Sequence, residues 1–162
     1  MAGEPLAPAG ALLLPAIDED AGPFWEGARR GELRVQQCPE TGRLLFPPRA
    51  RSPFAPHREP RWVTVSGRGA IWSFAVPHPP LLPPFAELAP YPVIAVALEA
   101  DPRVRLVGNL LARRGGAINE VDAATIEIGA RVRAVFERVS DEIHLPRWIL
   151  DRFATRGRGG PT

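Results

Sequence analysis

The stretch from residue 38 to residue 62, CPETGRLLFPPRARSPFAPHREPRW, constrains the fold more than any other. Cys38 is followed by a tight turn at Gly42, an apolar segment at 44–46 and two prolines, which is the order of a zinc-knuckle hairpin. A structural zinc site needs four donors, usually two Cys-x-x-Cys pairs, and Cys38 is the single cysteine of the chain. Metal binding supplies much of the folding free energy of a small zinc ribbon, so this lobe must be held by packing instead. We expect that packing to come from Leu44, Phe46, Phe54 and Trp62.

A short helix is expected just before this hairpin. Acidic residues at 18–20 suit a helix N-terminus, Pro23 suits a first turn, and Gly31 suits the end. Phe24 and Trp25 fall on this helix and need a cover. The cover is either the ribbon of the same chain or a partner protein, and both readings stay open.

The rest of the chain predicts strands, so the fold class is mainly β. Residues of the second lobe alternate between apolar and polar types, as half-buried strands do, while prolines between 77 and 90 exclude a strand there. Five short strands separated by turn signals predict a small closed barrel. The expected regions are an extended arm (1–17), a helix with the ribbon-like lobe (18–60), a barrel (61–150) and a flexible tail (151–162). Within the barrel the expected strands are 70–76, 93–99, 103–111, 131–138 and 143–148.

Composition limits the classes of function. All 20 basic residues are arginine and the net charge is only +2, which does not call for nucleic acid as a partner. One cysteine cannot form an internal disulfide bond. The apolar run LAPAGALLLPAI lacks a basic n-region and is too short to span a bilayer. A cytoplasmic protein without a membrane partner is therefore expected.

No catalytic constellation is evident in the sequence. The histidines, His57, His78 and His144, are not accompanied by a carboxylate and a nucleophile at a recognisable spacing. The G-x-G at 67–69 is typical of a hairpin turn and does not follow the pattern of a phosphate-binding loop. A binding role is favoured over an enzymatic one.

Several runs together resemble one known family. They are PFWEGARRGELRVQQC at 23–38, FPPR at 46–49, WVTVSGRG at 62–69, and the later PYPVIAVALE and VRLVGNLL. Their order and spacing resemble the acyl-CoA-associated OB-fold family with an N-terminal rubredoxin-like zinc ribbon, a family catalogued as a domain of unknown function. The resemblance implies a five-stranded OB-fold barrel after the ribbon.

The resemblance also bears on the metal. Thr41, Ser52 and Ala55 stand where the family has cysteine, so a degenerate, zinc-free ribbon is implied and no cofactor is expected. Cys38 and His57 provide two donors without a second pair, which is too few for a strong site, so His57 is expected on a surface loop.

The function implied by the resemblance is that of a non-catalytic, acyl-CoA-binding accessory subunit. Its partner would be a thiolase-like enzyme, a sterol-carrier-type thiolase or aldolase, or a hydratase. Arginine forks suit the phosphates of CoA, and an aromatic ring suits its pantetheine arm. The expected ligand residues are Arg43, Phe46, Arg49, Arg51 and Asn109, and the expected partner interface contains Phe24, Trp25 and His78.

Each of these residues also has a simpler structural interpretation. The arginines also fit a solvated surface, Asn109 also fits a structural tie inside a strand, and Trp72 and Phe74 are expected in the core. Two other functions stay open: a single-stranded nucleic-acid binder, since OB-folds often stack bases on aromatic side chains, and a purely structural interaction module.

Overall fold

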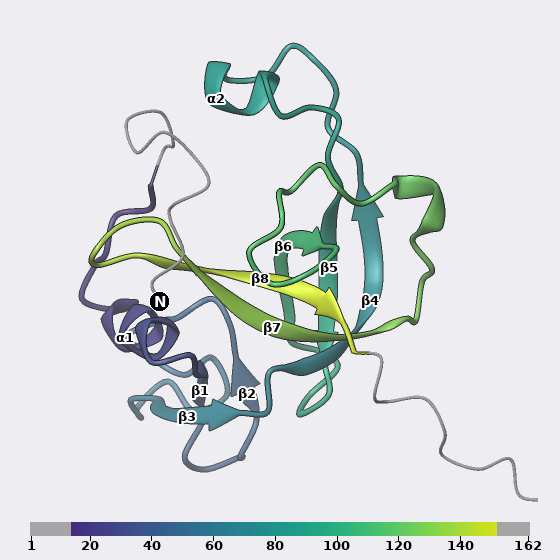
Figure 1. Ribbon diagram of the computed structural model, residues 1–162. Coiled ribbons are helices and arrows are strands. Elements are labelled where there is room, and N and C mark those ends of the chain that lie inside the picture. The colour runs from purple at the N-terminus through teal and green to yellow at the C-terminus, as the bar shows by residue number, and fades with distance from the viewer. Residues whose placement is uncertain (1–13, 152–162) are drawn as a thin grey trace, which may run out of the picture.

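The computed structural model describes residues 14–151. The expected tail, except for Asp151, and most of the expected arm lie outside these residues. The described chain is mainly β, as expected, and consists of two sheets with short helices (Figure 1). The elements are α1 (Gly22–Arg29), β1 (Leu33–Gln37), β2 (Leu44–Leu45), β3 (Arg61–Val65), β4 (Arg68–Ala75), α2 (Pro83–Ala86), β5 (Val93–Leu98), β6 (Arg105–Leu111), the 3₁₀ turn η1 (Ala123–Thr125), β7 (Arg131–Arg138) and β8 (His144–Leu150).

The first sheet has three antiparallel strands in the order β2-β1-β3. β1 and β2 form the expected ribbon hairpin, with Gln36 opposite Leu45. β3, expected at the start of the barrel lobe, instead pairs along its whole length with β1, so that Val63 lies opposite Val35. The alternation of apolar and polar residues identifies a strand but not its partner. The barrel therefore begins only at Arg68, after a turn in which Gly67 has a φ of 70°.

The second sheet closes into a barrel with the strand order β4-β5-β6-β8-β7. β4 pairs with both β5 and β7 and so completes the ring. A bulge shifts the register of β4 between Ile71 and Ser73. The proline-rich segment after β4 carries α2, and a long connection between β6 and β7 carries η1. Figure 1 shows both projecting at the end of the barrel away from the ribbon sheet.

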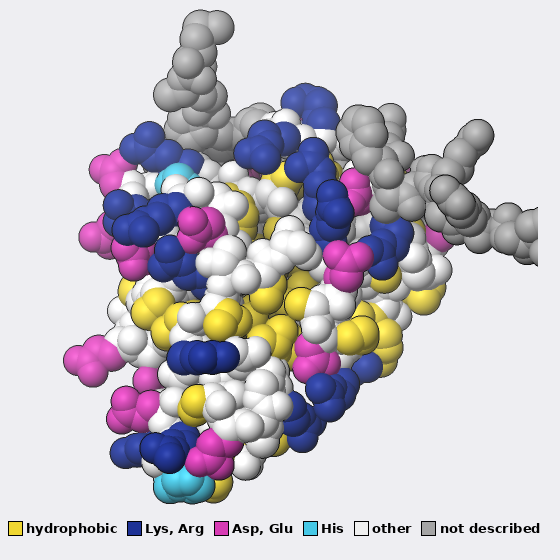
Figure 2. Space-filling model, turned by 90° about the horizontal axis from the view of Figure 1, so that it is seen from below, with side chains coloured by type: hydrophobic (Ala, Val, Ile, Leu, Met, Phe, Trp, Pro, Cys, Tyr) yellow, Lys and Arg dark blue, Asp and Glu magenta, His cyan; other side chains and the backbone are white. Residues whose placement is uncertain are grey.

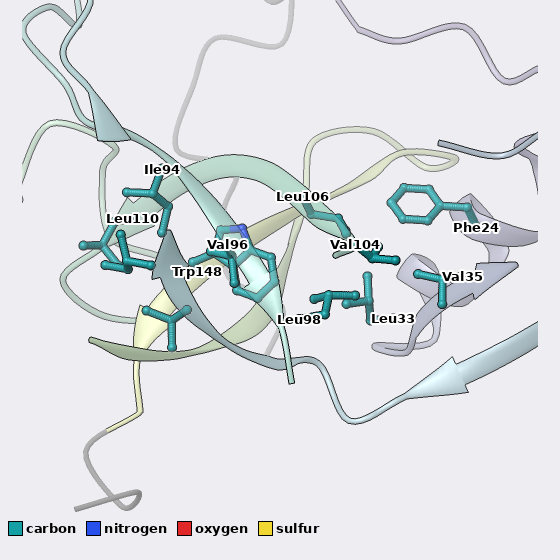
Figure 3. Close-up of a cluster of buried hydrophobic side chains, with 12 residues drawn as sticks. Phe24, Leu33, Val35, Ile94, Val96, Leu98, Val104, Leu106, Leu110 and Trp148 are labelled. Atoms are coloured by element: carbon teal, nitrogen blue, oxygen red, sulfur yellow. The ribbon is translucent and has the colours of Figure 1, made fainter. Parts of the chain in front are cut away.

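One hydrophobic core runs through both sheets (Figure 3). Phe24 of α1 and Leu33 and Val35 of β1 belong to the same cluster of buried side chains as Trp148 in the barrel. This continuity packs the ribbon lobe against the barrel. Among residues 14–151, no helix has the length and hydrophobicity needed to cross a lipid bilayer.

Candidate ligand groove, knuckles and barrel face

Two knuckle turns face each other beside the ribbon sheet. In the first, the backbone N–H of Gly42 donates to the carbonyl of Cys38 over 2.9 Å. In the second, the N–H of Ala55 donates to the carbonyl of Ser52 over 3.3 Å, and these two residues also form an isolated β-bridge. Cys38, Ser52 and Ala55 are buried, so the two turns enclose a small interior.

Side chains connect the first knuckle to the second. The Glu40 carboxylate accepts from Arg58 Nε over 3.0 Å and lies 2.8 Å from His57 Nε2. The hydrogen bond from Arg58, with help from His57, holds the pKa of Glu40 below its ordinary value. The guanidinium of Arg43 lies 3.7 Å from the centre of the Phe54 ring, a cation–π contact.

The residues at the knuckles do not fit a zinc ion. A structural site needs four nitrogen or sulfur donors, whereas these positions hold one thiol, two hydroxyls and a methyl group: Cys38, Thr41, Ser52 and Ala55. No group of three or more His, Cys, Asp or Glu side chains is placed to hold a metal within the described range. Burial raises the pKa of the Cys38 thiol, but hydrogen bonds with Ser52 and Thr41 outweigh burial and lower that pKa to about 7.

A groove of about 800 Å³ runs along the junction of ribbon and barrel. The ribbon hairpin and β3 form one side, and the turn between β5 and β6 forms the other. Arg43 is one of the lining residues, and its Nε is buried and has no hydrogen-bond partner in the part of the chain that the structure describes. The lining residues are Gln37, Thr41, Gly42, Arg43, Leu44, Val63, Thr64, Val65, Ala100, Asp101, Pro102 and Arg103.

The far wall of the groove carries a fixed ion pair. Asp101 accepts from Arg103 Nε over 2.8 Å and from Arg103 Nη2 over 2.9 Å. These hydrogen bonds lower the pKa of Asp101 and raise that of Arg103. Arg103 is neutralised by Asp101, whereas Arg43 has no ion pair in the described chain. Of the two lining arginines, Arg43 is therefore the one without a carboxylate partner there.

A second cavity, of about 460 Å³, lies under the connection between β6 and β7. Apolar side chains such as Leu111 form its floor, and Glu120, Asp122 and Glu127 lie among its lining residues, none of which is basic. Carboxylates repel phosphate, so this cavity does not suit CoA.

The structure brings only one of the expected ligand residues to the groove, Arg43. Arg49 is tied through its backbone, whose N–H donates to Gln36 Oε1 over 2.8 Å and whose carbonyl accepts from Gln36 Nε2 over 3.0 Å. Arg51 lies 3.9 Å from Glu59. Phe46 packs on Phe24, with ring centres 5.4 Å apart. Of this set, Arg49, Arg51 and Phe46 therefore lie outside the groove lining.

Asn109 is a structural tie. Its Nδ2 donates to the carbonyl of Pro92 over 3.1 Å, and its Oδ1 accepts from Arg147 Nη1. Arg147 in turn donates to Glu137 over 2.8 Å. Both polar atoms of this buried amide thus form hydrogen bonds inside the barrel, which favours the alternative interpretation of Asn109 as a structural tie.

The expected partner residues have different environments. Phe24 is only 5% exposed, so its ring is covered by this chain and is not available to a partner. Trp25 is half-buried and meets Phe24 edge to face at 5.0 Å. His78 is exposed in the proline-rich segment. Phe46, in the ribbon lobe, lies against Phe24, so this ring is covered by the same chain, whereas Trp25 stays partly exposed.

The barrel has an exposed apolar face that the sequence pattern does not predict. Trp72 and Phe74, expected in the core, are 52% and 38% exposed. The bulge beside Trp72 changes which side chains of β4 point inward. A signal was present in β5, where large residues alternate with alanines, because the alanines mark the face that is not packed. We call the outer surface of Trp72, Ala95, Ala97, Arg105 and Val107 the barrel face.

The barrel face has a defined chemistry. Ala95 lies opposite Val107 and Ala97 opposite Arg105 in the β5–β6 pairing, and Val107 is 67% exposed. The Arg105 guanidinium stacks on the Trp72 ring at 3.7 Å. α1 packs against β7 and β8 and so leaves this side of the barrel uncovered. Figure 2 views the molecule from below relative to Figure 1. On that side, apolar side chains lie among arginines and carboxylates.

Comparisons with known proteins agree on one family. Residues 25–51 match the model of the ChsH2 rubredoxin-like zinc ribbon domain, and residues 62–137 match that of the ChsH2 C-terminal OB-fold domain. A DUF35 domain-containing scaffold protein of Methanothermobacter thermautotrophicus is 31% identical, and the match covers 70% of this chain and 78% of that protein.

Two longer relatives are named as hydratase subunits. The alpha subunit of 3-oxo-4,17-pregnadiene-20-carboxyl-CoA hydratase of Mycobacterium tuberculosis is 33% identical over 86% of this chain. A probable enoyl-CoA hydratase alpha subunit of Thermomonospora curvata is 30% identical over 82% of it. This chain spans 39% and 38% of their respective lengths.

Two solved structures share the fold. A chain of the Ltp2-ChsH2(DUF35) aldolase superposes with a TM-score of 0.66 at 28% identity, covering 85% of this chain and 98% of that one. A DUF35 protein of unknown function from Sulfolobus solfataricus has a TM-score of 0.53 at 12% identity, covering 82% of this chain and 86% of its own, and supports the fold alone.

Proposed function

Because this chain belongs to the DUF35 family of ChsH2-like proteins, we propose that it is a non-catalytic accessory subunit that binds acyl-CoA for a partner enzyme. The partner is a hydratase, an aldolase or a thiolase-like enzyme. Relatives named as a hydratase alpha subunit, as a scaffold protein and as part of an aldolase complex support the accessory role.

The observation that carries the acyl-CoA part is the groove at the junction of ribbon and barrel. Its volume of about 800 Å³ is in the range of ligand sites. Leu44, Val63 and Val65 provide apolar walls for a pantetheine arm. Arg43 provides a guanidinium that is partly desolvated and held in place by Phe54, which suits a phosphate.

Replacement of Arg43 tests this site. We expect Arg43→Met, which keeps part of the aliphatic stem, to weaken CoA binding about tenfold or more, because a charge-assisted hydrogen bond contributes about 1.5–3 kcal/mol. The measurement is isothermal titration calorimetry with CoA and acetyl-CoA at two salt concentrations. Arg138→Ala, an exposed arginine that pairs with Asp141 and does not line the groove, is the matched control. Equal affinities for the two variants, or no binding to the unaltered protein, would contradict the groove assignment.

We assign the contact with the partner enzyme to the barrel face. Interface hot spots are rich in Trp and Arg surrounded by apolar surface, and the barrel face presents Trp72 and Arg105 beside Val107. This face is formed by β4, β5 and β6, whereas the groove is lined mainly by the ribbon, β3 and the β5–β6 turn, so ligand and partner occupy different surfaces.

Loss of the Trp72 ring is expected to release the partner. Tagged protein is recovered from its native cell extract, and the copurified proteins are identified by mass spectrometry. We expect an acyl-CoA hydratase, aldolase or thiolase in stoichiometric amount with the unaltered chain, and at least a tenfold lower yield with Trp72→Ala. The control Ile128→Ala removes an apolar side chain that is 61% exposed outside the barrel face, and it should keep the partner.

Two other results would argue against the proposed function. Turnover of acyl-CoA by the isolated chain contradicts the non-catalytic role. Salt-sensitive binding of a single-stranded oligonucleotide, together with no copurified enzyme, supports the nucleic-acid alternative instead.

A further inference from the structure

We infer that the ribbon of this protein folds without zinc, although the family model that it matches is a zinc ribbon, and that packing and side-chain contacts between the knuckles take the place of the metal. This inference is independent of the proposed function, because it concerns how the lobe is held and not what it binds.

The chain has few side chains that could bind zinc. The whole chain has one cysteine and three histidines. His78 lies in the proline-rich segment and His144 on β8, so His57 is the one histidine near the knuckles. Uncharged hydroxyls and a methyl group, at Thr41, Ser52 and Ala55, cannot replace thiolates as zinc ligands.

The side chains near Cys38 do not form an alternative set of zinc ligands. Cys38, Glu40 and His57 lie close in sequence or are bonded to one another, but they do not converge. Cys38 is fully buried, whereas the side chains of Glu40 and His57 are 41% and 67% exposed and are engaged with each other and with Arg58. A metal bound by the exposed pair would lack the buried sulfur.

Hydrophobic packing and contacts between the two knuckles replace the metal. Cys38, Leu45 and Ala55 form a small apolar cluster with Phe54 packed against it. Glu40, on the first knuckle, binds Arg58 on the second, and Arg43 stacks on Phe54. Exposed ion pairs contribute little by themselves, so the main support is burial. Leu33 and Val35 of β1, in the centre of the ribbon sheet, are packed in the core shared with the barrel.

The four knuckle positions keep the sequence spacing of a metal site. Each knuckle retains the local hydrogen bonds described above, and the spacing Cys38-x-x-Thr41 with Ser52-x-x-Ala55 matches two pairs of ligands. Three substitutions by cysteine, all small in volume, should therefore rebuild the site. An ordinary surface loop would not acquire zinc affinity so easily.

The first experiment uses the unaltered full chain, expressed with zinc in the medium and purified without chelator. We expect less than 0.1 zinc per chain by plasma mass spectrometry, and a melting temperature that changes by less than 1 °C on adding EDTA or zinc chloride. Stoichiometric zinc, or a lower melting temperature in EDTA, would overturn the inference. If zinc is found, its loss in His57→Ala or in Cys38→Ser identifies the ligand.

The second experiment restores the ligands. The variant Thr41→Cys/Ser52→Cys/Ala55→Cys is expected to bind one zinc per chain and to melt at a lower temperature in EDTA than in zinc. Adding Cys38→Ser to it removes one ligand and should weaken zinc binding at least tenfold. A folded triple variant that takes up no zinc contradicts the retained knuckle geometry, while the zinc content of the unaltered chain tests the metal-free fold even if this variant does not fold.

Discussion

Replacing Trp148 with alanine is expected to lower the free energy of unfolding by about 3–5 kcal/mol, the usual cost of removing a large aromatic side chain from a core. Trp148 is among the largest fully buried side chains of the protein and lies on β8 inside the barrel. Its ring belongs to the cluster that continues into the ribbon lobe (Figure 3). The cavity would therefore weaken both lobes at once.

The measurement is urea unfolding followed by circular dichroism, with Trp148→Phe as the control. The indole Nε1 of Trp148 is buried without a hydrogen-bond partner in the described residues. Losing that N–H therefore costs no hydrogen bond, and phenylalanine keeps most of the ring volume. We expect Trp148→Phe to cost less than about half as much as Trp148→Ala. Equal costs for the two variants would contradict the expectation that the cost follows the side-chain volume lost from the core.

Replacing Gly69 with alanine is expected to cost about 1–3 kcal/mol or more, the range for overpacking a dense interior. Gly69 is buried on β4, and a Cβ there would lie 2.5 Å from the carbonyl oxygen of Ala97 and 2.5 Å from Cγ1 of Val96. The first of these atoms belongs to the backbone of the paired strand β5. The strands must separate to admit the methyl group, since backbone cannot rotate away as a side chain can.

Thermal and urea unfolding of Gly69→Ala test this, with Gly22→Ala as the matched substitution. Nothing lies within 4 Å of a Cβ at Gly22, which is the first residue of α1. Alanine also favours a helix more than glycine does, so Gly22→Ala should leave stability unchanged or slightly raised. Unchanged stability in Gly69→Ala would mean that β4 and β5 are not paired as described.

The shared core has a consequence for the groove. The groove is lined by both lobes, so its width depends on how firmly the ribbon is held against the barrel. If the ribbon were held by a metal alone, removing the metal would detach the ribbon side of the groove from the barrel. Here Leu33 and Val35 hold it through burial, and the groove is a property of one continuous core.

Much of the fold was accessible from the sequence. Period-two alternation predicted the barrel strands, and the mainly β class with an OB-fold is confirmed. The sequence does not decide whether the ribbon or a partner covers α1. The structure buries Phe24 against Phe46 of the same chain, and the partner role of Trp25 stays a prediction. The candidate site was harder to predict from the sequence. Arg43 was expected and lies in the groove, whereas Trp72 was assigned to the core and is exposed.

The sequence by itself determined where strands and turns form and which donors the knuckles have, because strand periodicity, glycine turns and the number of cysteines are local or countable properties. Only the tertiary structure decided that β3 pairs with β1, that the bulge in β4 turns Trp72 outward, and that the amide of Asn109 is used inside the barrel. Pairing partners, the inward face of a strand and the satisfaction of a buried amide depend on contacts between residues far apart in the chain. Such contacts are set by the packing of the whole core, which no local pattern contains.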